Sequence, residues 1–254
     1  MTETSRLPDG RSALPASARL AWWGTAWLRG AIGPDDLLDA VVAGDVTHVV
    51  VGEDPALVSF LARQRDAGAG AVGAAYPAPG DAVGLRGPAA LTGSAIEQGE
   101  AAVLLGSGTA LVPAAVGRAV EWTPYDAARR PPPDLGEADR NLRATVLSTA
   151  RELAALDVAR WRPEIADELM DLRAQRPLRP PPGVPDRCVE LAGRALHLWQ
   201  VLDLAAGDHG AAVSATEMQR RREALQPLDH AVRLAMTAAF SPDGWPHENL
   251  RPMP

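Results

Sequence analysis

The sequence predicts a small, mainly parallel βαβ layer followed by a bundle of four to five helices, that is, an α/β unit and an all-α unit. Two observations favour this fold class. In the first half, short strand-like runs alternate with helical segments. In the second half, apolar residues recur only at helical spacing. The proline run at 131–133 separates the halves, because proline disfavours helix in itself and in the residue before it.

These boundaries predict the domain organisation. The expected parts are an N-terminal tail at 1–16, an α/β domain at 17–127, a proline-rich linker at 128–136, a helical bundle at 134–241 and a C-terminal tail at 242–254.

In the first half, Pro34 with Asp35 and Asp36 is typical of a helix start, since proline suits the first turn and acidic side chains suit the helix dipole. β-Branched runs predict strands, and glycines predict the turns between the elements. In chain order, the predicted elements are a helix at 34–43, a strand at 46–51, a helix at 54–68, a strand at 71–76, a helix at 88–99 and strands at 101–105, 109–116 and 120–123.

In the second half, Asp134 followed by Glu137 forms a capping-box pattern that predicts a helix start. Further helices are predicted from Pro163 and over 186–206, and the latter is apolar on two sides, so we expect it to be the central helix. Ser214 with Glu217 predicts another start, and Pro227 predicts a kink or restart in the helix that follows. The helix continues as far as 239.

The composition excludes several chemistries. All 25 basic residues are arginine. Without lysine there is no Walker A site, no Schiff-base enzyme and no protein-kinase mechanism. Cys188 is the only cysteine, so an intrachain disulfide and a cysteine-rich metal site are excluded.

The same composition predicts a cytoplasmic protein with no nucleic-acid and no membrane partner. The N-terminus lacks the apolar core of a signal peptide, and no apolar run is long enough to span a bilayer. A formal net charge of −7 disfavours contact with phosphate backbones. We expect no cofactor and no bound metal.

Candidate ligand-binding residues follow the predicted strands, because open parallel sheets bind ligands at the carboxyl ends of their strands. Five polar side chains belong to this predicted crevice: Glu53, Asp54, Tyr76, Asp81 and Ser107. Local roles explain them equally well: Asp54 as a helix cap, Asp81 as a turn residue and Ser107 at a hairpin tip.

Trp22, Trp23 and Trp27 lie within six residues of one another. One interpretation makes Trp22 and Trp23 an aromatic wall for a ligand or partner. The alternative, which we favour, is that the tryptophans fill the seam between the sheet and the bundle.

Three further patterns favour ordinary structural roles. Glu164, Glu168 and Asp171 share a helical face, and a solvated face explains them better than a Mg²⁺ site. The arginine run at 220–222 is expected to be solvated. We expect His48 to be packed in its strand and Cys188 to be a small core residue.

Four segments resemble an uncharacterised family of high-GC actinobacteria: RLAWWGTAWLRG, YPAPGDAVGL, and the pair DVARWRPE and VSATEMQRRREALQPLD. The resemblance covers most of residues 17–240. It implies a cytoplasmic setting and no particular activity.

The sequence therefore predicts a soluble, non-catalytic binding or protein-interaction protein, with a protein partner or a second copy of itself bound to the bundle. The alternative is a small-molecule-binding protein or an enzyme that uses the carboxylate-lined crevice, with a divalent cation as an option. No residue is identified as catalytic.

Overall fold

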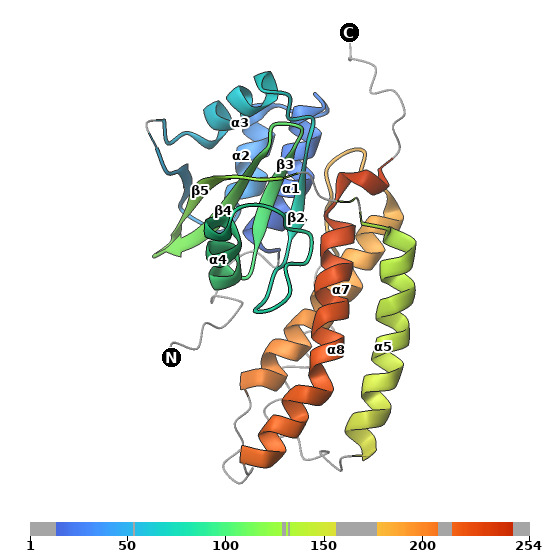
Figure 1. The fold of residues 1–254 in the computed structure, drawn as a ribbon. Coiled ribbons are helices and arrows are strands. Elements are labelled where there is room, and N and C mark those ends of the chain that lie inside the picture. Colours follow the sequence, from blue (N-terminus) through green and yellow to red (C-terminus); the bar gives the residue numbers. More distant parts are fainter. Residues whose placement is uncertain are drawn as a thin grey trace.

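The computed structural model describes residues 14–52, 54–128, 131, 133–155, 177–207 and 215–245 (Figure 1). Within these ranges, no helix combines the length and the apolar character that crossing a membrane requires.

The first half forms one five-stranded sheet with the strand order β1-β5-β4-β3-β2. Only β1 and β5 pair in parallel, whereas the other three pairs are antiparallel. The strands are β1 (Thr47–Val50), β2 (Ala71–Ala75), β3 (Ala101–Leu105), β4 (Thr109–Val116) and β5 (Ala119–Asp126). The prediction of strands is confirmed, but the prediction of a mainly parallel sheet is wrong.

Short connections explain the antiparallel pairs. Tight turns at 106–108 and 117–118 join β3 to β4 and β4 to β5, and turns of this length reverse the chain. Between β2 and β3, the loop at 76–88 itself runs the length of the sheet, because Arg86 accepts a hydrogen bond from Ala128, just past the end of β5. The following helix then returns the chain, so β3 starts beside the end of β2 and runs against it.

Helices cover the two faces of the sheet unequally. Buried residues of α1 (Ala16–Leu28), α2 (Pro34–Val42) and α3 (Leu57–Asp66) pack on one face. On the other face, α4 (Ala89–Gln98) packs over β2, β3 and β4 (Figure 1). The half of that face formed by β1 and the start of β5 lies outside the α4 cluster.

The second half provides α5 (Leu135–Ala155), α7 (Asp186–Gly207), α8 (Ala215–Ala239) and a short 3₁₀ helix, η1 (Pro242–Gly244). The predicted cap at the start of α5 is confirmed, because Asp134 accepts a hydrogen bond from the Glu137 N–H at 2.7 Å. The predicted helix from Pro163 and the cap at Ser214 lie outside the described residues. The number of helices in the bundle therefore stays a prediction.

Among the described helices, α8 packs against both α5 and α7, and its end reaches β2. Whether the helix at 186–206 is central in the whole bundle stays a prediction, because the predicted helix from Pro163 lies outside the described residues. Of the two outcomes predicted at Pro227, the restart is excluded because α8 continues through the proline, and the kink stays a prediction. Pro227 is exposed, and so is Glu223, whose carbonyl loses its helical donor at the proline.

The sheet and the helices of the second half share one core. A single hydrophobic cluster contains buried residues of α1, the sheet, α7 and α8. The outer edge of β2 is closed by the same elements. The Thr25 hydroxyl donates to the Val72 carbonyl at 3.0 Å and accepts from the Val72 N–H, while the Ala74 N–H donates to the Phe240 carbonyl. The Val72 N–H and carbonyl and the Ala74 N–H are therefore not open to another strand.

Candidate functional site

The residues of the predicted crevice do not converge. Ala75 pairs with Ala101 and Ala71 with Leu105, so β2 and β3 end at opposite ends of the sheet. Tyr76 consequently follows β2 at one end, whereas Ser107 lies in the turn after β3 at the other. The rule that groups strand ends at one edge applies to parallel strands, and this sheet violates that condition.

Asp54 and Ser107 take local positions. Asp54 is exposed, accepts a hydrogen bond from the Ala56 N–H just before α3, and pairs with Arg63 at 2.5 Å. The expected role of Asp54 as the helix cap is wrong, because the cap residue of α3 is Ala56, two positions later, and the helix starts at Leu57. The Ser107 hydroxyl is buried and has no hydrogen-bond partner among the described residues. Glu53 lies outside the described residues.

Tyr76 is buried in the core rather than exposed in a crevice. Its hydroxyl lies 3.4 Å from the Ser17 hydroxyl, and its ring packs edge-on against Trp199 at 5.8 Å between centroids. Burial, together with the nearby Glu100 carboxylate, raises the pKa of Tyr76 well above its ordinary value. The phenol is therefore neutral at physiological pH.

The tryptophans also lie in the interior. Trp22 is fully buried, donates its indole N–H to the Ala239 carbonyl at 3.1 Å and packs on Phe240 at 4.7 Å. Trp23 is partly buried against the same cluster, and Trp27 is 8% exposed. In this position Trp22 joins α1 to the end of α8, as expected for a residue in the seam between the two halves.

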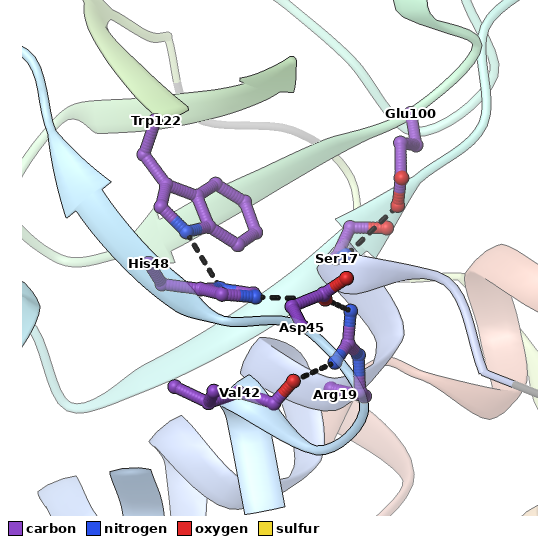
Figure 2. Close-up of polar contacts among 7 residues, drawn as sticks. All are labelled: Ser17, Arg19, Val42, Asp45, His48, Glu100 and Trp122. Atoms are coloured by element: carbon purple, nitrogen blue, oxygen red, sulfur yellow. Dashed lines mark hydrogen bonds and ion pairs between the residues drawn. The ribbon is translucent and has the colours of Figure 1, made fainter. Parts of the chain in front are cut away.

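The most connected polar group of the interior is a chain of four side chains from α1, β1, β5 and the segment before β1, which we call the His48 chain (Figure 2). The Trp122 indole N–H donates to His48 Nδ1 at 3.1 Å. His48 Nε2 lies 3.0 Å from an oxygen of Asp45, and Arg19 donates to that same oxygen at 2.7 Å. A second Arg19 nitrogen donates to the carbonyl of Val42 at the end of α2.

The His48 chain has the partners of an acid–base pair but no free nitrogen. In a catalytic Asp–His arrangement, the carboxylate holds one imidazole nitrogen and the other faces the substrate. Here the second nitrogen accepts the indole N–H, and the side chains of His48 and Asp45 are 0% and 1% exposed. Burial opposes the ionisation of Asp45, but the hydrogen bonds from Arg19 and His48 outweigh it and lower its pKa. The expectation that His48 is packed is confirmed.

Glu100 is a partly buried carboxylate, and it meets the first turn of α1 (Figure 2). The helix has no side-chain cap of its own, and Glu100 accepts the Ser17 N–H at 2.8 Å. Burial raises the pKa of Glu100, against the hydrogen bonds from Ser17. This carboxylate occupies the position where a helix start would otherwise bind an anion.

A second Asp–His pair lies where the loop after β2 meets α8. Pro79 and Gly80 form a tight turn, with Gly80 at φ 78°, and the turn presents Asp81 to the helix. One Asp81 oxygen lies 2.5 Å from His230 Nδ1 and 2.8 Å from Arg233.

Arg233 links this pair to its surroundings. Its other nitrogens donate to the Asp229 carboxylate at 2.9 Å and to the Tyr76 carbonyl at 3.3 Å. Burial opposes the ionisation of Asp81, but the hydrogen bonds from His230 and Arg233 lower its pKa. His230 is half-exposed, and the structure describes no partner for its Nε2 atom.

Neither Asp–His partnership was fully predicted from the sequence. Asp81 was a candidate, but its partners are 149 and 152 residues away along the chain. The three-residue spacing of Asp45 and His48 carries a weak signal, and nothing in the sequence points to Trp122 as the third member.

Metal and thiol chemistry find no support among the described residues. No group of three or more His, Cys, Asp or Glu side chains there is placed to hold a metal ion. The acidic residues Glu164, Glu168 and Asp171 lie outside the described residues. Burial raises the pKa of Cys188 to about 11, so its thiol is unreactive, as expected for a core residue.

One open hollow of about 580 Å³ lies where the start of α4 meets the end of β5. None of the predicted site residues lines it. The lining residues are Arg86, Gly87, Pro88, Asp126, Ala127 and Ala128.

Comparison with known proteins covers almost all of the described chain. Residues 17–135 match the family model "Rv1486c-like protein, N-terminal domain", and residues 136–237 match "Rv1486c-like protein, C-terminal domain".

The chain belongs to the Rv1486c-like protein family.

Two relatives are both 28% identical over 286 aligned positions, covering 91% of this chain and 98% of theirs. They are "Uncharacterized protein Rv1486c" of Mycobacterium tuberculosis strain H37Rv and "Uncharacterized protein MT1533" of strain CDC 1551. No solved structure matches the chain. The resemblance to an actinobacterial family is thus confirmed.

Proposed function

We propose that this protein is a non-catalytic, cytoplasmic interaction protein that binds a protein partner. The observation that carries the proposal is the part of the sheet, at β1 and the start of β5, that lies outside the α4 cluster among the described residues. Thr47 and Val49 alternate with the buried His48 and Val50, so they lie on the same face as α4 but outside the cluster that α4 forms with β2, β3, β4 and the end of β5.

The neighbouring strands extend this surface. Val49 is level with Glu121, and Thr47 is level with Ala119, which pairs with Val116. Val116 is 50% exposed, and Val51, just beyond β1, is 49% exposed. A sheet face is ordinarily covered by a second layer, and exposed apolar side chains on such a face favour a protein–protein contact.

The polar contacts within the chain also support the proposal. The two nitrogens of His48, the first turn of α1 and the Asp81 carboxylate are all engaged in contacts within the chain. These contacts join elements of the fold. They leave the outer surface as the region available for function.

Two measurements test the proposal. One is sedimentation velocity of the purified protein at several concentrations, and the other is chemical cross-linking of the protein in cell extract. We expect Val116→Asp to abolish the assembly that the parent protein forms. Ala115→Asp is the matched control, because Ala115 is also exposed but alternates to the opposite face. This surface is excluded as the interface if the parent protein stays monomeric and if the Val116→Asp variant still forms every cross-link that the parent forms.

A small-molecule site at Asp81 is the second candidate. It is favoured by the half-exposed His230, whose Nδ1 contacts the Asp81 carboxylate while the structure describes no partner for its Nε2. A proton-accepting histidine with an orienting carboxylate has this arrangement. Thermal melting against metabolites, nucleotides and divalent cations tests it, because a ligand of the native state raises the midpoint. A shift that Asp81→Asn removes would favour this candidate over the interaction protein.

A further inference from the structure

We propose that the His48 chain is an acid-sensitive lock, which holds β1 and the end of α2 to the rest of the sheet layer and releases them when His48 takes up a proton. The chain joins all the elements concerned. His48 lies on β1, Trp122 on β5 and Arg19 on α1, and Arg19 also reaches the Val42 carbonyl at the end of α2 (Figure 2).

The hydrogen bonds define the protonation state of His48. An indole N–H only donates, so His48 Nδ1 must present its lone pair to Trp122. The proton of the neutral imidazole then sits on Nε2 and is donated to Asp45. His48 is therefore neutral in the folded chain, and its tautomer is set by its two neighbours.

A second proton on His48 disrupts this arrangement. It would place an N–H at Nδ1 against the N–H of Trp122, inside a side-chain environment with 0% exposure. The charged groups that face the site are Asp45 and Arg19, with Glu100 near Arg19 at the start of α1. A protonated His48 would share one Asp45 oxygen with Arg19, so two cations would compete for the same acceptor atom.

The position of β1 makes the opening local. β1 has four residues and lies at the edge of the described sheet, where β5 is its one neighbouring strand and a single bridge joins Val49 to Ala56 on the other side. Its outer side is held by the Val50 N–H, which donates to the Pro55 carbonyl at 2.9 Å. Edge elements with few partners open at lower free energy than the interior of a sheet.

Proton linkage gives the size of the effect. A released histidine binds a proton below about pH 6.5, whereas the locked one does not. Below that pH, the equilibrium constant for opening β1 rises by up to about tenfold for each pH unit.

Hydrogen exchange on the full chain between pH 7 and pH 5, corrected for the intrinsic pH dependence of exchange, tests the lock. We expect the opening of residues 45–52 to increase with acid, while the protection of β3 and β4 changes less. His48→Gln removes the titration but keeps one acceptor and one donor, so it should remove the acid response. His197→Gln, on the surface of α7, is the control and should leave that response unchanged.

A second measurement keeps the inference testable if His48→Gln does not fold. Imidazole ¹⁵N spectra of the parent protein should show the Nε2–H tautomer of His48 at pH 7 and no titration of the folded signal down to pH 5. Trp122→Phe removes only the indole donor, so His48 can then accept a proton beside Asp45, and the acid response should shrink. A folded-state titration of His48 in the parent, or equal acid responses in the parent and His48→Gln, would overturn the proposal.

Discussion

Asp45 and His48 lie inside the sheet layer, whereas Asp81 and His230 lie where the loop after β2 meets α8. Both pairs join a carboxylate to an imidazole, and in both an arginine shares the carboxylate. They differ in solvent contact: Asp45 is 1% exposed and Asp81 is 31% exposed. The same residue types thus form a closed structural core in one place and a proton-accessible junction in the other.

The energetic consequence follows from desolvation. Removing one partner of a buried ion pair leaves the other charge without compensation, and water cannot reach it. Removing one partner of a half-exposed pair lets water replace the lost contact. Substitutions in the two pairs should therefore differ severalfold in their effect on the free energy of unfolding.

The largest effect is expected for Asp45→Ala. It leaves the Arg19 guanidinium, 5% exposed, without its carboxylate and removes the acceptor of His48. We expect a loss of about 3–5 kcal/mol in the free energy of unfolding. Urea denaturation measures it, and a loss no greater than that of Asp81→Ala would contradict the contrast between the two pairs.

Asp81→Ala should have a smaller effect. The carboxylate is partly exposed, and Arg233 keeps its contacts with Asp229 and the Tyr76 carbonyl. We expect a loss of about 1 kcal/mol, measured in the same urea titration. His230→Gln serves as the companion variant, because it removes the ionisable partner while retaining a donor.

The pH dependence of stability should differ between Glu100 and the two carboxyl groups whose pKa values are lowered, Asp45 and Asp81. The folded pKa values of Asp45 and Asp81 are lowered, so their stabilisation is present above the unfolded pKa and is lost as pH falls through the folded one. The folded pKa of Glu100 is raised, so the sign reverses: the cost of its charge grows as pH rises above the ordinary glutamate pKa and is complete above the folded pKa.

The raised pKa of Glu100 predicts how Glu100→Gln changes stability. The amide still accepts the Ser17 N–H but carries no charge to desolvate. We expect the thermal midpoint at pH 7 to be retained or raised. The gain over the parent should shrink as pH falls toward the ordinary pKa of glutamate. A midpoint at pH 7 clearly below that of the parent would show that the charge itself stabilises α1.

The smallest effect is expected for Arg63→Gln. The pair with Asp54 lies at the surface, with side-chain exposures of 52% and 42%. Water and salt screen such a pair, so the urea midpoint should not change measurably. A clear loss would mean that exposure is a poor guide to the strength of ion pairs in this chain.

The positions of the local elements were largely determined by the sequence. The periodicity and the turn residues located all five strands, and Asp134 was predicted and found as the cap of α5. These features depend on interactions between residues within a few positions of one another, so a local pattern contains them.

The direction of the strands was decided by tertiary structure. Whether β2 runs with or against β3 depends on where the loop at 76–88 travels, and residues packed from α8 hold that loop. The predicted crevice does not form for this reason, because the prediction assumed parallel strands and this sheet contains strands of both directions.

The polar partnerships were also decided only in three dimensions. The sequence by itself determined that His48 would be packed and that Asp81 would lie in a turn. Only the fold brought Trp122 to His48, 74 residues away, and His230 to Asp81, 149 residues away. Buried polar groups must find partners wherever the chain places them, and no local pattern records a partner that is distant in sequence.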